Sequence, residues 1–175
     1  AAAESTDALV RSLDGELAPS GERGAGLEGL DADARDLANQ PPVVRYVNLL
    51  IREAHEARAS EVHVEATAHG PVVRLRIDGI LVEATAPPAT IQAAVVSRLK
   101  LIADLDIAER RAPQDGRIRI RLEGQDLDLR VSTVPSLFGE SIVLRLLDHR
   151  SAPEGLEQLG MDRAVLDAFV ASARR

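Results

Sequence analysis

The stretch PQDGRIRIRLEGQDLDLRVSTVPSLFGESIVLRLLD, residues 113–148, decides the fold. Charged and aliphatic residues alternate along it, and a period of two is typical of strands that have one buried and one solvated face. Glu123 and Gly124 follow the first run and indicate a tight hairpin turn. The stretch therefore predicts three consecutive antiparallel strands, GRIRIRL, QDLDLRVST and SIVLRLLD.

The residues before this stretch predict a second group of three strands. The runs EVHVEA and PVVRLRID alternate in the same way, and Asp78-Gly79 is a strong hairpin signal ahead of ILVEAT. Apolar residues recur at helical spacing in VVRYVNLLIREAHEARA, ATIQAAVVSRLKLIADL and MDRAVLDAFVASARR. We expect the first of these helices to bury only a narrow face. This order of elements predicts an α+β fold, with a mainly antiparallel sheet and helices packed on one face.

The first 40 residues have a different composition. They carry nine acidic residues against three arginines and few large apolar groups, so they can bury little surface against the entropy of ordering. We expect a flexible or helical linker with one or two short helices, separated by Pro41-Pro42 from the compact domain.

Composition excludes several kinds of site. The chain of 175 residues contains no cysteine, so it forms no disulfide or thiolate metal site. Its only lysine, Lys100, lies in SRLKLI, so these residues contain no phosphate-binding loop of the GxxxxGK[ST] type. We find no apolar run that could span a bilayer and no signal-peptide layout, and therefore expect a cytoplasmic protein without membrane insertion. Aromatic residues make up 2% and the net charge is -7, which disfavours a nucleic-acid partner.

The arginines of the opening stretch fall on one strand face. A two-residue turn at Glu123-Gly124 places Arg117 opposite Arg130, and a turn one residue later places Arg119 opposite Arg130. In the first register, Arg119 and Arg121 have aspartates opposite them, which neutralise their charge. Arg130 faces another arginine in both registers, and Arg145 of the next strand is expected to join Arg130 and Arg117 on the polar face.

Like charges directly opposite each other destabilise a sheet by up to about 1 kcal/mol, so solvent or an anion must accompany them. Guanidinium groups hold phosphate oxygens in a planar, bidentate way, so Arg130, Arg145 and Arg117 form a candidate site for a polyphosphate carried by another domain. The alternative is the solvated charged face that most half-exposed antiparallel sheets have. The pattern alone leaves both interpretations open.

Other polar residues indicate no chemistry of their own. His63 and Glu65 share a strand face, but a metal would need a third ligand, and a polar strand edge explains both residues as well, so we predict no metal site. Four acids near the second helix have no nucleophile beside them, and we predict no catalytic residue in this chain. They are Asp104, Asp106, Glu109 and Asp115.

The segment VPSLFGE, residues 134–140, is expected to be a loop because it begins beside a strand-breaking proline. Leu137 and Phe138, if exposed, would suit a domain interface, and the alternative is that Phe138 packs into the core of its own domain.

Five blocks of the sequence resemble, in order, the secretion ATPases that power type II protein secretion and type IV pilus assembly. The blocks are ASEVHVEA, VVRLRIDGIL, VSRLKLIADLDIAERRAPQDGR, LRVSTVPSLFGESIVLRLLD and LEQLGM. They are long and ordered, and they cover about residues 41–161. The resemblance implies that residues 41–148 are the second N-terminal domain of that family, a PAS-like two-layer module. Residues 1–40 would then be an acidic linker, and residues 149–175 a connector and helix leading to a RecA-like motor domain.

The resemblance also implies a role for two arginines. Family members use arginines of the RVST and VLRLLD blocks to approach the nucleotide held by the motor domain, and these blocks place them here at Arg130 and Arg145. They would complete an ATP site as an arginine finger does, whereas Arg117 is supported by strand pairing alone. The implied cofactors are ATP and magnesium, bound mainly by the motor domain, and none is expected for this chain alone.

The implied partners are the protein's own motor domain, neighbouring subunits of a hexamer and inner-membrane secretion platform proteins. Type II members dock onto their inner-membrane partner through a globular first N-terminal domain, which we do not find ahead of Pro41.

Two functions remain open at this point. The first is a regulatory and nucleotide-site-completing N-terminal domain of a hexameric ATPase, inactive as an enzyme by itself. The second is a stand-alone PAS-like sensory or protein-interaction module that binds a ligand or partner through its sheet. The reading frame after Arg175 distinguishes them, because a GxxxxGK[ST] stretch there supports the first and a stop codon supports the second.

Overall fold

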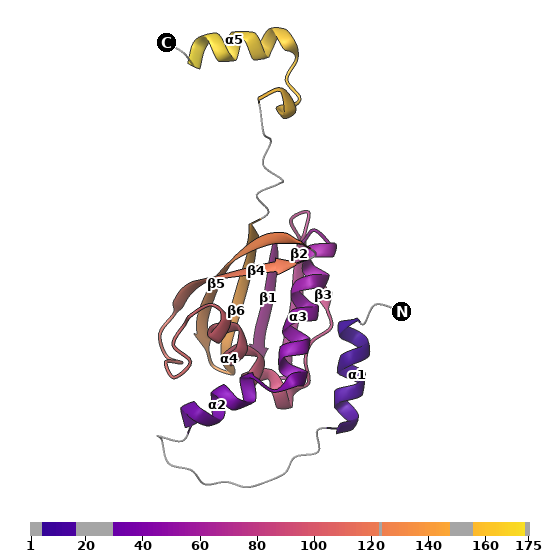
Figure 1. Cartoon of the computed structure of the whole chain (residues 1–175), viewed down its shortest axis with the longest axis vertical. Helices are drawn as coiled ribbons and strands as arrows, with labels where there is room; N and C mark the ends of the chain where they lie inside the picture. Colours follow the sequence, from indigo (N-terminus) through magenta and orange to yellow (C-terminus); the bar gives the residue numbers. More distant parts are fainter. Residues whose placement is uncertain (1–4, 17–29, 123, 148–155, 174–175) are drawn as a thin grey trace.

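A six-stranded antiparallel sheet forms the centre of the computed structural model (Figure 1). The structure describes residues 5–16, 30–122, 124–147 and 156–173. The strands are β1 Glu61–Thr67, β2 Gly70–Ile77, β3 Ile80–Ala84, β4 Gln114–Leu122, β5 Gln125–Ser136 and β6 Gly139–Leu147. The helices are α1 Thr6–Glu16, α2 Leu30–Ala38, α3 Pro41–Glu56, α4 Gln92–Ile102 and α5 Arg163–Ala173, with short 3₁₀ helices η1 Ala89–Ile91 and η2 Leu156–Leu159.

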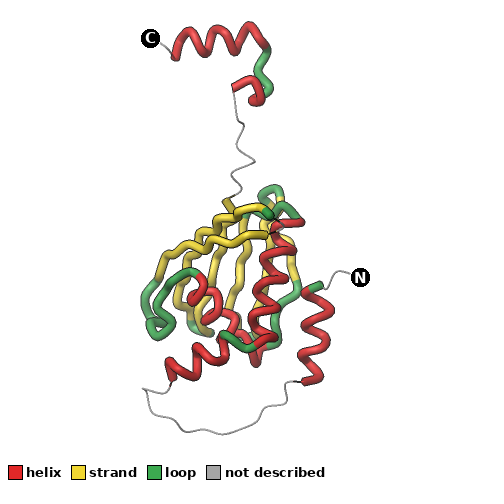
Figure 2. The backbone as a smooth tube through the Cα atoms, viewed as in Figure 1, coloured by secondary structure: helices red, strands yellow, loops and turns green. Residues whose placement is uncertain are grey.

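The sheet consists of two three-stranded meanders that meet in its middle. Its strand order is β3-β2-β1-β6-β5-β4, and β1 pairs antiparallel with β6 to join the two groups. Helix α4 connects them, and α3 and α4 lie on the same face of the sheet (Figure 2). The predicted α+β fold, a two-layer arrangement with helices on one face of an antiparallel sheet, is confirmed.

The hairpin predicted at Asp78-Gly79 forms as expected. Asp78 has φ 49° and Gly79 has φ 83°, and the favoured two-residue hairpin turn requires positive φ at both positions. Ile77 and Ile80 flank the turn as cross-strand partners.

The hydrophobic core lies between the sheet and its helices. The inward-facing strand residues are aliphatic, and the outward-facing neighbours along each strand are mostly polar, as the alternation predicted. Strand residues in the core cluster are Val62, Val64, Val73, Leu75, Ile118, Leu127, Leu129, Val131, Ile142 and Leu144.

Helix α3 buries more of its surface than the predicted narrow face. Tyr46 and Leu49 are buried although neither was expected, whereas Val44, which was expected in the core, is half-buried. The Tyr46 hydroxyl donates a hydrogen bond to the Thr85 carbonyl at 2.8 Å. The cause is α1, which lies alongside α3 (Figure 1) and places Leu9 and Leu13 in the same core cluster. The acidic segment was therefore correctly predicted to contain helices, but its contribution to the core was not foreseen.

The segment predicted as a loop over residues 134–140 is mostly strand. β5 continues through Pro135 to Ser136, and only Leu137 and Phe138 form the turn into β6. The proline is tolerated because β4 pairs with β5 only as far as Thr133, so that β5 has one neighbour at Pro135. Leu137 is 89% exposed and Phe138 is 53% exposed, which is the first of the two arrangements expected for them.

The C-terminal elements η2 and α5 lie apart from the sheet in Figure 1. Among the described residues of α5, Leu166 is buried. Both ends of the expected connector, residues 149–155 and 174–175, and parts of the expected linker, residues 1–4 and 17–29, lie outside the described residues. None of the described helices is long and apolar enough to cross a membrane.

Candidate anion-binding site

The three arginines singled out in the sequence form one row across three strands. Arg117 of β4 lies directly opposite Arg130 of β5, and Arg130 lies directly opposite Arg145 of β6. This is the first of the two registers considered above, with Leu122 and Gln125 pairing on either side of the turn. Directly opposite residues place their Cβ atoms about 5 Å apart, so Arg130 has an arginine as its direct cross-strand neighbour on both sides.

The neighbouring arginines of β4 are neutralised as predicted. Arg119 lies opposite Asp128, with Nε 3.2 Å from Oδ1. Arg121 lies opposite Asp126 at 4.0 Å, and both of these side chains are largely exposed. These pairs leave the row at Arg117, Arg130 and Arg145 as the concentrated positive charge of this half of the sheet.

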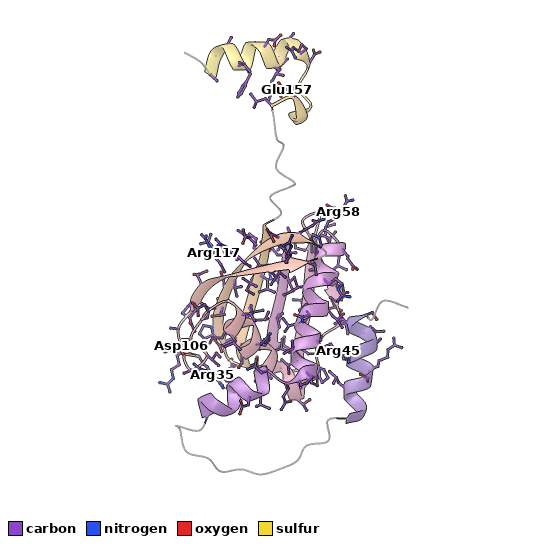
Figure 3. The ribbon with its side chains drawn as sticks, viewed as in Figure 1. Arg35, Arg45, Arg58, Asp106, Arg117 and Glu157 are labelled. Atoms are coloured by element: carbon purple, nitrogen blue, oxygen red, sulfur yellow. The ribbon has the colours of Figure 1, made fainter. Side chains whose placement is uncertain are left out.

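The row lies on the face of the sheet that the helices leave open. All three side chains are exposed, and Figure 3 shows Arg117 at the outer margin of the sheet. Within the part of the chain that the structure describes, neither Arg117 nor Arg130 forms an ion pair. An incoming anion can therefore reach both guanidinium groups without displacing an internal partner.

A glutamate on β1 extends the row of charged residues from the strands β4–β6 to the strands β1–β3. Glu61 of β1 lies directly opposite Arg145 on one side and Arg76 of β2 on the other. Glu61 Oε1 accepts hydrogen bonds from Arg145 Nη2 at 2.7 Å and Nε at 3.2 Å. Its Oε2 accepts from Arg76 Nε at 2.8 Å and from His63 Nε2 at 3.0 Å.

These contacts hold Glu61 in its charged form. The hydrogen bonds from Arg145, His63 and Arg76 lower the pKa of Glu61 from 4.5 to about 2, against the opposing effect of desolvation. The carboxylate is ionised at neutral pH, and it offsets part of the repulsion between the arginines beside it. Because two arginines share this one carboxylate, the cluster still carries a net positive charge.

The histidine and glutamate considered as metal ligands are engaged by other side chains, His63 in a hydrogen bond and Glu65 in an ion pair. His63 contacts Glu61, and Glu65 takes Arg74 Nη1 with both oxygens, at 2.8 and 2.9 Å. In the described ranges of the chain, no group of three or more histidine, cysteine or acidic side chains is placed to hold a metal ion.

Three of the four acids near α4 support local structure. Asp106 accepts a hydrogen bond from the Ala108 backbone N–H at 2.9 Å, and Asp115 accepts one from the Ser132 hydroxyl. Glu109 accepts backbone N–H groups of the two residues that follow Arg110, and these bonds lower its pKa. The contacts are typical of a solvated loop rather than of paired catalytic acids.

The single lysine has a role that the sequence did not reveal. Lys100 is fully buried, and its Nζ donates to Glu140 Oε1 at 2.7 Å and to the Glu109 carbonyl at 2.5 Å. The Gln114 side chain donates to the same carbonyl at 3.1 Å. Lys100 thus fastens the end of α4 to the start of β6 and to the loop before β4.

The open face has the donors that a candidate anion site needs, but it offers little for chemistry. The row presents guanidinium donors from separate strands of a rigid sheet, a suitable arrangement for binding phosphate oxygens. Glu61, the carboxylate that contacts the row among the described residues, is fully occupied by three donors, and its low pKa makes it a poor proton acceptor. The geometry favours binding and charge stabilisation over catalysis by these residues alone.

Comparison with known proteins gives a consistent result. The family model described as "Type II/IV secretion system protein" matches residues 36–175. The type II secretion system protein E of Xanthomonas campestris pv. campestris is 47% identical over 161 residues, which are 92% of this chain and 27% of that protein. The type IV pilus assembly ATPase PilB of Myxococcus xanthus is 46% identical over 143 residues, which are 81% of this chain and 25% of that protein.

The chain therefore spans about a quarter of the length of these relatives. Among solved structures, the pilus retraction motor PilT with bound ADP matches 67% of this chain and 33% of that chain, with a TM-score of 0.41 and 21% identity. A similarity of that size adds nothing to the sequence comparisons.

Proposed function

The chain belongs to the family of type II/IV secretion system proteins, and from this premise we propose that it completes the nucleotide site of a secretion or pilus-assembly ATPase. In this proposal Arg130 and Arg145 contact the phosphates of an ATP held mainly by a motor domain. Arg117 adds positive charge at the outer end of the same row. The chain is not an enzyme by itself.

One observation carries the proposal. Arg130 and Arg145 lie directly opposite each other on the exposed face of a rigid sheet, and within the described residues Arg130 has no acidic partner. Guanidinium groups directly opposite each other need solvent or an anion beside them, and a phosphate would take that place. Transferring phosphoryl groups carry the charge that such donors stabilise.

The comparisons support the proposed setting of this site. Because the chain spans about a quarter of its relatives, we propose that residues 41–148 act as a domain beside a motor domain, with residues 1–40 as linker and 149–175 as connector. ATP and magnesium would serve the whole protein in the cytoplasm. The motor domain, neighbouring subunits of a hexamer and the inner-membrane secretion platform would be its partners.

A first test is the reading frame beyond Arg175. The proposal expects a GxxxxGK[ST] stretch shortly after this residue, because its lysine and backbone N–H groups would bind the phosphates that the arginines approach. A stop codon or an unrelated output domain would favour the stand-alone interaction module instead.

The second test measures ATP hydrolysis by the protein that joins this chain to its motor domain. Arg130→Ala and Arg145→Ala should each lower kcat about tenfold or more, because a guanidinium that stabilises the transition state is lost. Arg119→Ala is the matched control, since Arg119 lies on the same strand face as Arg117 but is paired with Asp128. Parental rates in both Arg130→Ala and Arg145→Ala would show that the phosphate role is wrong.

A further inference from the structure

We propose that Glu61 is the positioning residue for Arg145, holding its guanidinium group ready for a phosphate. The proposal rests on the function proposed above and assigns a role to a residue that does not itself touch the nucleotide. It starts from the way in which Glu61 contacts Arg145, which differs from an ordinary surface ion pair.

Glu61 occupies only one edge of the Arg145 guanidinium group. The two contacts run from Nε and Nη2 to the same oxygen, Oε1, at 3.2 and 2.7 Å. A guanidinium group has five N–H donors, and the edge formed by Nη1 and the second hydrogen of Nη2 stays available for a bidentate contact. Arg145 can therefore bind a phosphate without releasing Glu61.

Glu61 is itself held from several directions. Its second oxygen is bound by Arg76 and His63, and Arg76 is fixed in turn because its Nη1 donates to the Gly79 carbonyl at 2.8 Å. The Glu61 side chain is 14% exposed, whereas the Arg145 side chain is 60% exposed. A half-buried carboxylate that is held by several donors thus anchors one edge of an exposed arginine.

Such an anchor lowers the entropic cost of binding a phosphate. A long, exposed arginine side chain loses rotamer freedom when it binds a phosphate, and Glu61 imposes most of that loss before the phosphate arrives. Arg130 has no such anchor among the described residues. The site therefore combines one preorganised arginine with one that is free to adjust.

The negative charge of Glu61 does not cancel the positive charge of the arginines around it. Two arginines, Arg145 and Arg76, share this one carboxylate, and Arg130 lies opposite Arg145 on the other side. The net charge facing a phosphate stays positive. Arg76 thus compensates part of the negative charge of Glu61 and keeps its side chain in place.

The test is a double-mutant cycle on ATP hydrolysis by the protein that joins this chain to its motor domain. Glu61→Gln should lower kcat/KM about tenfold, because the neutral amide has one acceptor oxygen where Arg145 and Arg76 now use two, and it lacks the charge that holds the Arg145 guanidinium group. It should have no further effect when Arg145 is already alanine, and its full effect when Arg130 is alanine instead. Glu61→Asp, which keeps the charge on a shorter side chain, should fall between the parent and Glu61→Gln.

Glu65→Gln is the matched control. Glu65 lies on the same face of β1 and forms an equivalent ion pair with Arg74, but it does not contact Arg145. This variant should hydrolyse ATP at the parental rate. A loss equal to that of Glu61→Gln would assign the effect to general weakening of β1 and overturn the positioning role.

A second measurement, proton exchange at the arginine side chains of this chain, tests the contacts of Glu61 directly. The Nε–H signals of Arg145 and Arg76 in nitrogen-proton NMR spectra should exchange slowly with water in the parent, and both should become fast in Glu61→Gln. If Glu61→Gln fails to fold, Glu61→Asp serves in both measurements. Fast exchange at Arg145 in the folded parent would contradict the anchor.

The outcomes separate the two proposals. Parental activity in both Arg130→Ala and Arg145→Ala would refute the nucleotide-site function as a whole. A slow Arg145→Ala variant together with an unchanged or faster Glu61→Gln variant would leave that function intact and refute the positioning role, because Glu61 would then only compete with phosphate for Arg145.

Discussion

Glu61 shows how a single carboxylate can make a row of like charges tolerable in the absence of a ligand. It lies between Arg145 and Arg76 and binds both, so the central part of the row is stabilised within the chain. Arg117 and Arg130 lie on β4 and β5, too far across the sheet for Glu61 to contact them. The charge that invites an anion is therefore concentrated toward β4 and β5.

The lowered pKa of Glu61 predicts a specific pH dependence of stability. A carboxyl group whose pKa is lower in the folded state stabilises the fold above its unfolded pKa, 4.5, and this contribution is lost as the pH falls towards about 2. Glu61→Gln should be less stable than the parent by about 1 to 2 kcal/mol at pH 7. Urea unfolding at a series of pH values should show this difference shrinking between pH 4.5 and 2, and a constant difference would contradict the assignment.

Gly116 has a different role, since it allows a close approach between the sheet and a loop. A Cβ atom at this position would lie 2.6 Å from the Ala103 carbonyl oxygen and 2.8 Å from Leu105 Cδ2. A backbone oxygen cannot move away as a flexible side chain can. The small residue is thus required where β4 passes the end of α4.

Replacing this glycine should therefore be costly. We expect Gly116→Ala to lower the free energy of unfolding by about 1 to 3 kcal/mol, as overpacking of a well-packed site does. Gly124→Asn is a useful control, because Gly124 has open space around it and asparagine tolerates its positive φ of 81°. Thermal or urea unfolding measures both variants, and equal losses would show that the contact at Gly116 is easily relieved.

At the level of elements, the buried pair of Lys100 and Glu140 connects parts of the chain that are far apart in sequence. It joins α4 to β6, while the Lys100 contact with the Glu109 carbonyl adds the intervening loop. Side chains of both residues are almost entirely buried. Removing one partner would leave an uncompensated charge in the core.

Breaking this pair should destabilise the fold strongly. Lys100→Met and Glu140→Gln should each cost about 3 to 5 kcal/mol in the free energy of unfolding, and the double variant should cost less than the sum of the two. Arg163→Ala provides the contrast, because its pair with Asp167 is exposed and worth well below about 1 kcal/mol. Urea unfolding compares them, and a small effect of Lys100→Met would show that the ammonium group is easily hydrated.

The sequence predicted the elements well because each one leaves a local signal. Alternation identified five of the strands, and the turn residues at Asp78-Gly79 and around Gly124 set the hairpins, the first of which indicated β3. The register that places Arg117 opposite Arg130 also follows from one turn. The row of three arginines could thus be predicted from adjacent strands.

The features that the sequence did not predict depend on contacts between distant segments. Arg145 and Glu61 are 84 residues apart, and only the pairing of β1 with β6 brings them together. The alternating face of β1 offered a signal, because Glu61 has the same parity as His63 and Glu65, but it did not identify the partner strand. Lys100 carries no signal, since a lysine on a helix is normally exposed.

At the level of the whole molecule, a single core is shared by both meanders and by the helices. The cluster of buried residues includes α1, α3, α4 and strands from both halves of the sheet. Tyr46, the only tyrosine of the chain, lies in this cluster, and there is no tryptophan. The tyrosine therefore reports on the packing of α3 against the rest of the molecule.

This arrangement predicts cooperative unfolding. The loss of far-UV circular dichroism and the change in Tyr46 fluorescence should coincide in a urea titration, because neither meander has a separate core that would survive alone. Two resolved transitions would show that the halves unfold independently. Leu13→Ala should shift both signals together, since Leu13 belongs to the same cluster.

The pairing of β1 with β6 also has a consequence for synthesis of the protein. Glu61 leaves the ribosome long before Arg145, so the two can meet only after the last strand has been made and inserted beside the first. Contacts between strands this distant in sequence are slow to form. An unfinished or misfolded chain therefore lacks the contact that fixes Arg145, and the joined pair becomes a mark of completed folding.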